Sequence, residues 1–114
     1  MKSNIEKPWG SYQVLENTES YTLKKIIVNP GGKLSLQSHK HRSEHWVIAE
    51  GKAEIIIDEK VLIVGANESV IIPKGSKHRL TNNQNTKLII FELWFGDILD
   101  ENDIVRYEDI YGRS

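Results

Sequence analysis

The stretch LSLQSHKHRSEHW, residues 34–46, places three histidines, one glutamate and one glutamine within thirteen residues of an otherwise strand-like sequence. Short runs rich in Val, Ile and Leu surround it and end at turn residues, such as the NPGG of residues 29–32. About eight such runs, with turns roughly every 8 to 12 residues, favour an all-β sandwich or barrel. Only LDENDIVRYEDIYGR, residues 99–113, is expected to be partly helical.

Composition narrows the class of protein. The chain has 114 residues and no cysteine, which excludes disulfides and thiolate metal ligands. Its formal net charge of −1 gives no general attraction to nucleic acid or to an anionic membrane. The longest apolar run, residues 88–95, is too short to cross a bilayer, and the N-terminus lacks the apolar region of a signal peptide. We therefore expect one soluble, cytoplasmic domain over residues 1–114, with no nucleic-acid or membrane partner.

The polar residues of the opening stretch have a spacing that suits a metal ion. Gln37 and His39 lie at positions i and i+2 and should share one face of a strand. Glu44 follows across a tight polar turn, so the next strand can present its carboxylate at the same point. His78 comes after a Pro-x-Gly turn far along the chain. Imidazole, carboxylate and amide ligands suit several divalent metals, although spacing alone leaves a polar loop rich in histidine as an equal alternative.

Two longer patterns resemble the motifs of the cupin superfamily. The first cupin motif, G-x5-H-x-H-x(3,4)-E-x6-G, corresponds here to Gly31, Gln37, His39, Glu44 and Gly51, with glutamine replacing the first histidine. The second, G-x5-P-x-G-x2-H-x3-N, corresponds to Asn67, Pro73, Gly75, His78 and Asn82, with asparagine replacing the glycine. The resemblance implies an all-β cupin double-stranded β-helix, a jelly-roll barrel, with a short C-terminal helical segment. It also implies a metal inside the barrel, bound by Gln37, His39, Glu44 and His78.

The glutamine in the first motif narrows the resemblance further. SLQSHKHRSEHWVI, residues 35–48, resembles the SLQ-x-H-x-HR-x-EHW signature of type II phosphomannose isomerases. Those domains usually form the C-terminal part of a larger protein that also contains a mannose-1-phosphate guanylyltransferase. Similar family segments are KPWGSYQVLE, IPKGSKHRLTN and ENDIVRYEDIYGR, at residues 7–16, 72–82 and 101–113. The chain departs from the family in its last strand, where Trp94 and Phe95 replace a Gln-Ser pair and alter the expected pocket mouth.

The resemblance implies a metal-dependent mannose-6-phosphate isomerase that interconverts mannose 6-phosphate and fructose 6-phosphate. Because 114 residues leave no room for a nucleotide-binding domain and contain no Gly-rich phosphate loop, we expect this isomerase to be free-standing. A divalent metal, expected to be zinc with manganese, cobalt, iron or nickel as alternatives, would act as a Lewis acid on the sugar oxygens. Two other readings keep the same fold: a non-catalytic cupin that binds metal and sugar phosphate, and a partner subunit of a separate mannose-1-phosphate guanylyltransferase. A cupin dioxygenase, which would favour iron, is a further alternative.

Isomerase chemistry would need acid–base groups and cationic side chains that bind the phosphate. His41 and Glu92 are the candidates for acid–base catalysis. The candidates for substrate binding are Lys33, Ser35, Arg42, Arg79 and Arg106.

Strand alternation also predicts what lies on the outer face. If Gln37 and His39 point inward, Leu34 and Leu36 point outward from the same strand. Outward leucines need a cover, such as an N-terminal strand or a second subunit, and an open sheet edge is a liability. The sequence therefore predicts a homodimer.

Overall fold

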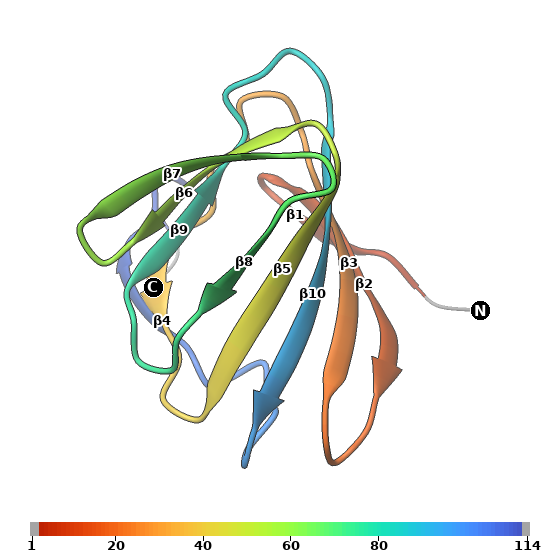
Figure 1. Cartoon of the computed structure of the whole chain (residues 1–114), viewed down its shortest axis with the longest axis vertical. Helices are drawn as coiled ribbons and strands as arrows, with labels where there is room; N and C mark the ends of the chain where they lie inside the picture. Colours follow the sequence, from red (N-terminus) through yellow and green to blue (C-terminus); the bar gives the residue numbers. More distant parts are fainter. Residues whose placement is uncertain (1–2, 113–114) are drawn as a thin grey trace.

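The computed structural model describes residues 3–112 as two antiparallel sheets that face each other and curve into a barrel (Figure 1). The first sheet contains, in spatial order, β1 (Ile5–Lys7), β2 (Gly10–Asn17), β3 (Thr22–Val28), β10 (Leu88–Gly96), β5 (Arg42–Glu50) and β8 (Ser69–Ile72). The second contains β11 (Val105–Glu108), β4 (Leu36–Ser38), β9 (His78–Thr81), β6 (Lys52–Ile57) and β7 (Lys60–Gly65). The all-β prediction is confirmed.

The central strands β3, β10 and β5 form because their residues alternate strictly between the two faces of the sheet. In β3 every second residue from Thr22 to Val28 is buried, and β10 repeats this pattern from Leu88 to Trp94. The inward positions change character along each strand. They are aliphatic at one end, as at Ile26 of β3, and charged at the other, as at Lys24. The barrel therefore has an apolar half and a charged half.

The apolar half is closed by side chains of both sheets. Ile48 of β5 and Ile90 of β10 pack in one cluster with Ile55 of β6 and Leu80 of β9. Asn82 secures this end, because its buried amide nitrogen donates to the carbonyls of Val28, Asn29 and Thr86 at 3.1, 3.2 and 2.8 Å. The asparagine of the second cupin motif thus has a structural role, in which one side chain links the end of β3 to the loop that follows β9.

The helical segment expected over residues 99–113 is absent from the part of it that the structure describes. Residues 101–102 form a turn, and residues 105–108 form β11, which pairs with β4. Tyr107 adds a hydroxyl–hydroxyl hydrogen bond of 2.9 Å to Ser38. This long-range pairing overrides the local helical signal; Arg113 lies outside the described residues. Nowhere in residues 3–112 is there a helix with the length and apolar character needed to span a membrane.

The leucines expected to face outward do not both do so. Leu34 is buried in the core cluster, and Leu36 is half-buried. Strand β4 begins only at Leu36, and Lys33 forms an isolated bridge to Thr81, so alternation cannot be extended back across residues 33–35. The argument for a homodimer from an outward Leu34 is wrong, and the homodimer itself stays a prediction.

Candidate functional site

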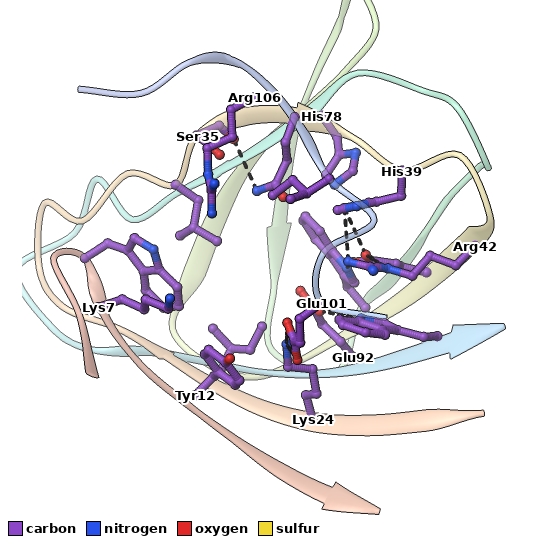
Figure 2. Close-up of a pocket in the computed structure, with 18 of the residues that line it drawn as sticks. Lys7, Tyr12, Lys24, Ser35, His39, Arg42, His78, Glu92, Glu101 and Arg106 are labelled. Atoms are coloured by element: carbon purple, nitrogen blue, oxygen red, sulfur yellow. Dashed lines mark hydrogen bonds and ion pairs between the residues drawn. The ribbon is translucent and has the colours of Figure 1, made fainter. Parts of the chain in front are cut away.

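The charged half of the barrel contains a cavity of about 260 Å³ (Figure 2). Its polar lining residues are Lys7, Tyr12, Lys24, Ser35, Gln37, His39, Arg42, Glu44, His78, Glu92, Glu101, Asn102 and Arg106. They come from both sheets and from the segment between β10 and β11. Aliphatic and indole groups of the core form the rest of the wall. A cavity of this kind, with polar groups converging on an otherwise buried space, is typical of a small-molecule site.

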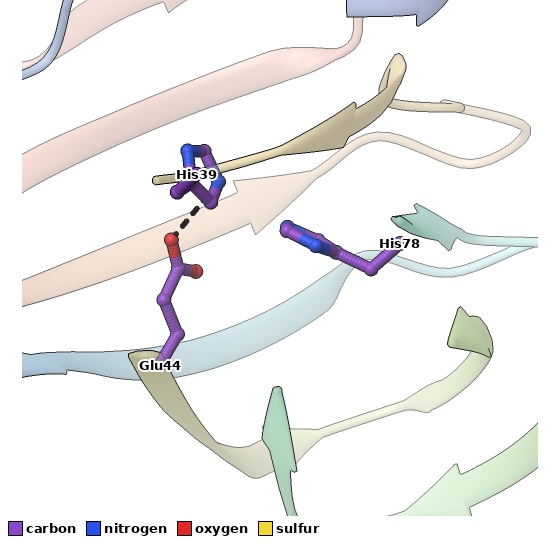
Figure 3. Close-up of side chains that lie close together, drawn as sticks. All are labelled: His39, Glu44 and His78. Atoms are coloured by element: carbon purple, nitrogen blue, oxygen red, sulfur yellow. Dashed lines mark ion pairs between the residues drawn. The ribbon is translucent and has the colours of Figure 1, made fainter. Parts of the chain in front are cut away.

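Three side chains at one end of the cavity form a compact cluster (Figure 3). His39 follows β4, Glu44 lies at an inward position of β5, and His78 begins β9. Their candidate ligand atoms all lie within 4.8 Å of one another, and all three residues are buried. The predicted convergence of these residues from three strands is therefore present in the fold.

Hydrogen bonds at the back of the cluster orient both imidazoles. Nδ1 of His39 lies 2.7 Å from the carbonyl oxygen of Asp103, and Nδ1 of His78 lies 3.0 Å from that of Ser76. A carbonyl only accepts, so each Nδ1 carries the proton and each Nε2 keeps its lone pair. Metal-bound imidazoles are held by outer partners in the same way.

The electrostatics of the cluster favour the protonation states that a cation needs. Burial lowers the pKa of His39 to about 4 and also lowers the pKa of His78. Burial alone would raise the pKa of Glu44, but Arg42 and the two histidines hold it at about 2. Neutral imidazoles beside an ionised carboxylate are the forms that bind a divalent metal without first losing protons. The donor set therefore fits a divalent ion.

Gln37, the predicted fourth ligand, lies next to His78 in the β4–β9 pair and lines the cavity. Its amide nitrogen donates to the carbonyl oxygen of Ser35 at 3.4 Å. Its role as a ligand stays a prediction.

Arg42, a predicted substrate-binding residue, contacts the cluster directly. Its Nε donates to Glu44 at 2.8 Å, and its Nη2 lies 3.3 Å from Nε2 of His39. Its Nη1 donates to the carbonyl of Asp100 at 3.1 Å, and its guanidinium carbon lies 3.4 Å from the ring centroid of Trp94. Arg42 therefore both lines the cavity and fixes the carboxylate of the cluster.

Ser35, Arg106 and Glu92 also line the cavity, as expected for site residues. Ser35 is 1% exposed, and its hydroxyl oxygen has no hydrogen-bond partner within residues 3–112, so a ligand could satisfy it. Burial, reinforced by Glu44, raises the pKa of Glu92 to about 8, and Nε1 of Trp94 donates to its Oε1 at 3.1 Å. Glu92 is thus a buried carboxyl group that can hold a proton near neutral pH.

Lys33, His41 and Arg79 are not brought to the cavity. The side chain of His41 is 41% exposed and lies 3.7 Å from Asp97, because residues 39–41 form a turn and the alternation of a strand does not apply there. Arg79 follows an inward-facing histidine and therefore points the other way, where it donates to Glu108. Lys33 is half-buried elsewhere.

The structure adds cavity residues that the sequence reasoning missed, chiefly Lys7, Tyr12, Lys24 and Glu101. Lys24 shares the inward face of β3 with Ile26, but the residues of this strand, TLKKIIV, do not alternate between apolar and polar and so do not mark which lysine points inward. No local pattern marks Glu101, which reaches the cavity from a turn.

Residues 1–109 match the family described as Mannose-6-phosphate isomerase C-terminal. The chain belongs to this family. The fold agrees with the cupin prediction. The structure superposes on an RmlC-like cupin from Shewanella frigidimarina with a TM-score of 0.76, at 17% identity, covering 89% of this chain and 87% of that one. It superposes on KdgF from a Halomonas species with a TM-score of 0.77, at 9% identity, covering 82% and 87%.

Similar curated proteins are much longer than this chain. Mannose-1-phosphate guanylyltransferase ManC of Salmonella typhimurium is 43% identical over 99% of this chain and 24% of its own length. Alginate biosynthesis protein AlgA of Pseudomonas fluorescens is 46% identical over 96% and 23%. Xanthan biosynthesis protein XanB of Xanthomonas campestris is 44% identical over 96% and 24%. The chain spans about a quarter of the relatives it matches.

These relatives correct the functional expectation. They include enzymes named for guanylyl transfer to mannose 1-phosphate, in which the matched segment is one C-terminal part of a longer protein. The expectation of a free-standing mannose-6-phosphate isomerase is therefore wrong. The comparison favours the alternative in which the domain is associated with a guanylyltransferase.

Proposed function

We propose that this cupin is the metal- and sugar-phosphate-binding module of a mannose-1-phosphate guanylyltransferase system. The observation that carries the proposal is a juxtaposition within one cavity. Two imidazoles and a carboxylate converge at one end, and the cations Lys7, Lys24, Arg42 and Arg106 line the same space. A sugar phosphate needs both a site for hydroxyl oxygens and a site for a phosphate group.

His39, Glu44 and His78 would hold the metal, with Gln37 as a candidate fourth ligand. We propose zinc, because two imidazoles and a carboxylate are a usual zinc donor set that leaves a position open. When bound, the ion supplies a Lewis acid that can accept sugar hydroxyl oxygens. Arg42 holds Glu44 in place beside it.

The other lining residues account for recognition of the ligand. Arg106 can contact phosphate through two donors at once, and Lys7 can add charge at the same wall. Ser35 offers the buried hydroxyl described above. Glu92, when it carries its proton, can donate a hydrogen bond to a sugar oxygen.

Association with a transferase follows from the relatives, which carry a matching domain within one long chain. Mannose phosphates held by the cupin would be kept near the transferase that uses them. We also propose a cytoplasmic location, because a chain without cysteine suits that reducing compartment.

Metal binding is tested by elemental analysis and calorimetry. We expect one divalent ion per chain, and Glu44→Gln should weaken it by at least about a hundredfold, more than the loss of an outer partner costs. Glu59→Gln, at an exposed turn, is the matched control and should bind metal normally. Equal metal affinity in both variants would contradict the assigned site.

The functional role is tested by two assays on the metal-loaded protein. Mannose 1-phosphate or mannose 6-phosphate should bind by calorimetry, and the chain should co-elute with a mannose-1-phosphate guanylyltransferase of the same cell and lower its KM for mannose 1-phosphate. Failure to bind either sugar phosphate would reject the module. Catalytic turnover of mannose 6-phosphate by the chain alone would reject a purely binding role.

A further inference from the structure

A buried lysine in the cavity is paired with a glutamate that is itself largely in solvent. The side chain of Lys24 is 6% exposed, whereas that of Glu101 is 49% exposed. Lys24 Nζ donates to both carboxylate oxygens of Glu101, at 2.9 and 3.1 Å. In Figure 2, Glu101 points down toward Lys24 from the segment between β10 and β11, and both line the cavity.

The surroundings of Lys24 hold the cation but do not neutralise it. Its Nζ lies 3.8 Å from the ring centroid of Tyr12 and 4.4 Å from that of Trp94. Aromatic faces attract a cation while leaving its charge unpaired. Glu92 is the register partner of Lys24 on β10, but its Oε1 accepts from Trp94, and the hydrogen bonds recorded for Nζ both go to Glu101.

The two partners of this pair differ in how firmly they are held. Lys24 lies in the middle of β3, hydrogen-bonded to strands on both sides, and a buried ammonium requires an anionic partner. Glu101 lies in a turn and reaches the lysine from solvent, so moving it outward exposes a carboxylate that is already half-hydrated. An anion that enters the cavity can therefore replace the glutamate while the lysine stays in place.

We propose that Lys24 is an oxyanion-binding residue of the cavity and that Glu101 is its exchangeable counter-ion, which the phosphate group of a ligand displaces. The site rests on the proposed function only for the identity of the molecule that carries the phosphate. Both carboxylate oxygens of Glu101 accept hydrogen bonds from Lys24, as two phosphate oxygens would. Glu101 therefore competes with a bound anion for Lys24 and lowers the affinity of the cavity for phosphate.

Displacement of Glu101 would also affect the cluster formed by His39, Glu44 and His78. The same segment supplies the carbonyl of Asp103 to His39 and the carbonyl of Asp100 to Arg42. Asp103 further accepts hydrogen bonds from the backbone amides of Lys40 and His41 at 2.9 Å each. Release of Glu101 removes one attachment of a segment that orients a candidate ligand, so phosphate affinity and metal affinity should be coupled, and the coupling must be reciprocal.

A second pair in the same molecule provides a matched comparison. Arg79, with 5% of its side chain exposed, pairs with Glu108, which is 61% exposed, at 2.9 Å. Arg79 does not line the cavity, and its other donors are used by the carbonyls of Leu34 and Glu108. Removing the charge of Glu108 therefore frees no cation toward the cavity.

The test is calorimetric titration of the metal-loaded protein with inorganic phosphate and, separately, with mannose 6-phosphate. Glu101→Gln should bind inorganic phosphate about five- to tenfold more tightly than the wild type, the scale of one charge-assisted contact. Glu108→Gln should match the wild type. Lys24→Met should weaken phosphate binding by about tenfold or more, and adding Glu101→Gln to Lys24→Met should bring no recovery.

The outcomes separate this inference from the proposed function. If the wild type binds mannose 6-phosphate but Glu101→Gln leaves both affinities unchanged, the counter-ion role is wrong and the sugar-phosphate module stands. If Glu101→Gln tightens inorganic phosphate while no sugar phosphate binds to any of the proteins, the counter-ion role stands and the module is rejected. Absence of any phosphate binding in all five proteins, the wild type, the three single variants and the double variant, overturns both.

A thermal measurement decides the matter if Lys24→Met does not fold. Glu101→Gln leaves a buried ammonium without its anion, so its Tm in phosphate-free buffer should fall below that of Glu108→Gln. Added inorganic phosphate should raise the Tm of Glu101→Gln more than that of the wild type. Equal increments in the two proteins would overturn the proposal.

Discussion

The two halves of the barrel interior are equally buried and opposite in chemistry. Ile26, Ile90 and Ile48 lie side by side on β3, β10 and β5, in register. Two residues further along the same strands, the inward positions hold Lys24 and Glu92 beside the indole of Trp46. All six residues are at most 5% exposed. The backbone is continuous through both layers, so the difference is one of side chains alone.

The comparison separates the residues that stabilise the fold, in the apolar half, from the ionisable residues in the charged half, which are the candidates for binding. Burying an aliphatic side chain contributes about 1.5–3 kcal/mol, which makes the isoleucine layer the source of stability. Burying an ionisable group costs free energy that pairing only partly returns. A barrel that keeps lysine and two glutamates inside one end therefore gives up stability there, as binding sites commonly do.

The largest expected effect is in the apolar layer. Ile90→Ala should lower the free energy of unfolding by about 2–5 kcal/mol, because it leaves a cavity among fully buried neighbours. Urea denaturation followed by circular dichroism measures the loss. The folded fraction should still bind one metal ion, since the change is outside the cluster. A loss below about 1 kcal/mol would remove the distinction between the halves.

The second expected effect is a gain in stability, and it comes from replacing a residue of the charged half, Glu92. The pKa of Glu92 is raised to about 8 in the folded protein, so the folded state binds its proton more tightly than the unfolded state. This residue therefore lowers stability progressively as pH rises from about 4.5 to 8, and has no such effect below that window. Glu92→Gln should raise the unfolding free energy of the metal-free protein by about 1–3 kcal/mol near pH 7.5.

Urea denaturation at pH 5 and pH 7.5, in the presence of a chelator, measures this change. The gain should be small at pH 5 and clear at pH 7.5. Glu59→Gln, at an exposed turn outside the cavity lining, is the control for the general effect of removing one glutamate. An equal gain at both pH values would show that packing, rather than ionisation, accounts for the effect.

The smallest change in stability is expected when both residues of the Lys24–Glu101 pair in the charged half are replaced together. The double variant Lys24→Met with Glu101→Gln should keep its stability within about 1 kcal/mol, because the desolvation cost disappears together with the attraction. Glu101→Gln alone should be less stable than the double variant, because it leaves a buried ammonium without its anion, whereas Lys24→Met alone leaves a carboxylate that can turn into solvent. Chemical denaturation of the four proteins gives this thermodynamic cycle directly. Additive losses in the cycle would mean that the two residues do not act as a pair.

Sequence reasoning succeeded where side chains stand on regular strands or close to defined turns. His39, Glu44 and His78 could be placed together because motif spacing fixes which strand each belongs to, and the structure brings them together. It failed where regularity stops. His41 lies in a turn, and Leu34 precedes the first paired residue of β4, so counting alternate positions misplaced both.

Contacts between distant segments were out of reach for a different reason. Glu101 meets Lys24 across 77 residues of chain, and no local pattern encodes that meeting. The helical appearance of residues 99–113 was likewise overruled by the pairing of β11 with β4. Arg79 points away from the cavity and pairs with Glu108, a contact across 29 residues that no local pattern encodes.

The position of Trp94 gives the cavity an optical property. Two cations lie against its indole, with Lys24 Nζ 4.4 Å and the Arg42 guanidinium carbon 3.4 Å from the ring centroid, and the indole donates to the Glu92 carboxyl group. The emission wavelength of an indole follows the electric field along its ring, so a ligand that rearranges these charges shifts the colour of its fluorescence. The chain has three tryptophans, so replacing Trp9 with phenylalanine would simplify the spectrum. The intrinsic fluorescence of Trp94 can therefore report ligand binding in the cavity without an added label.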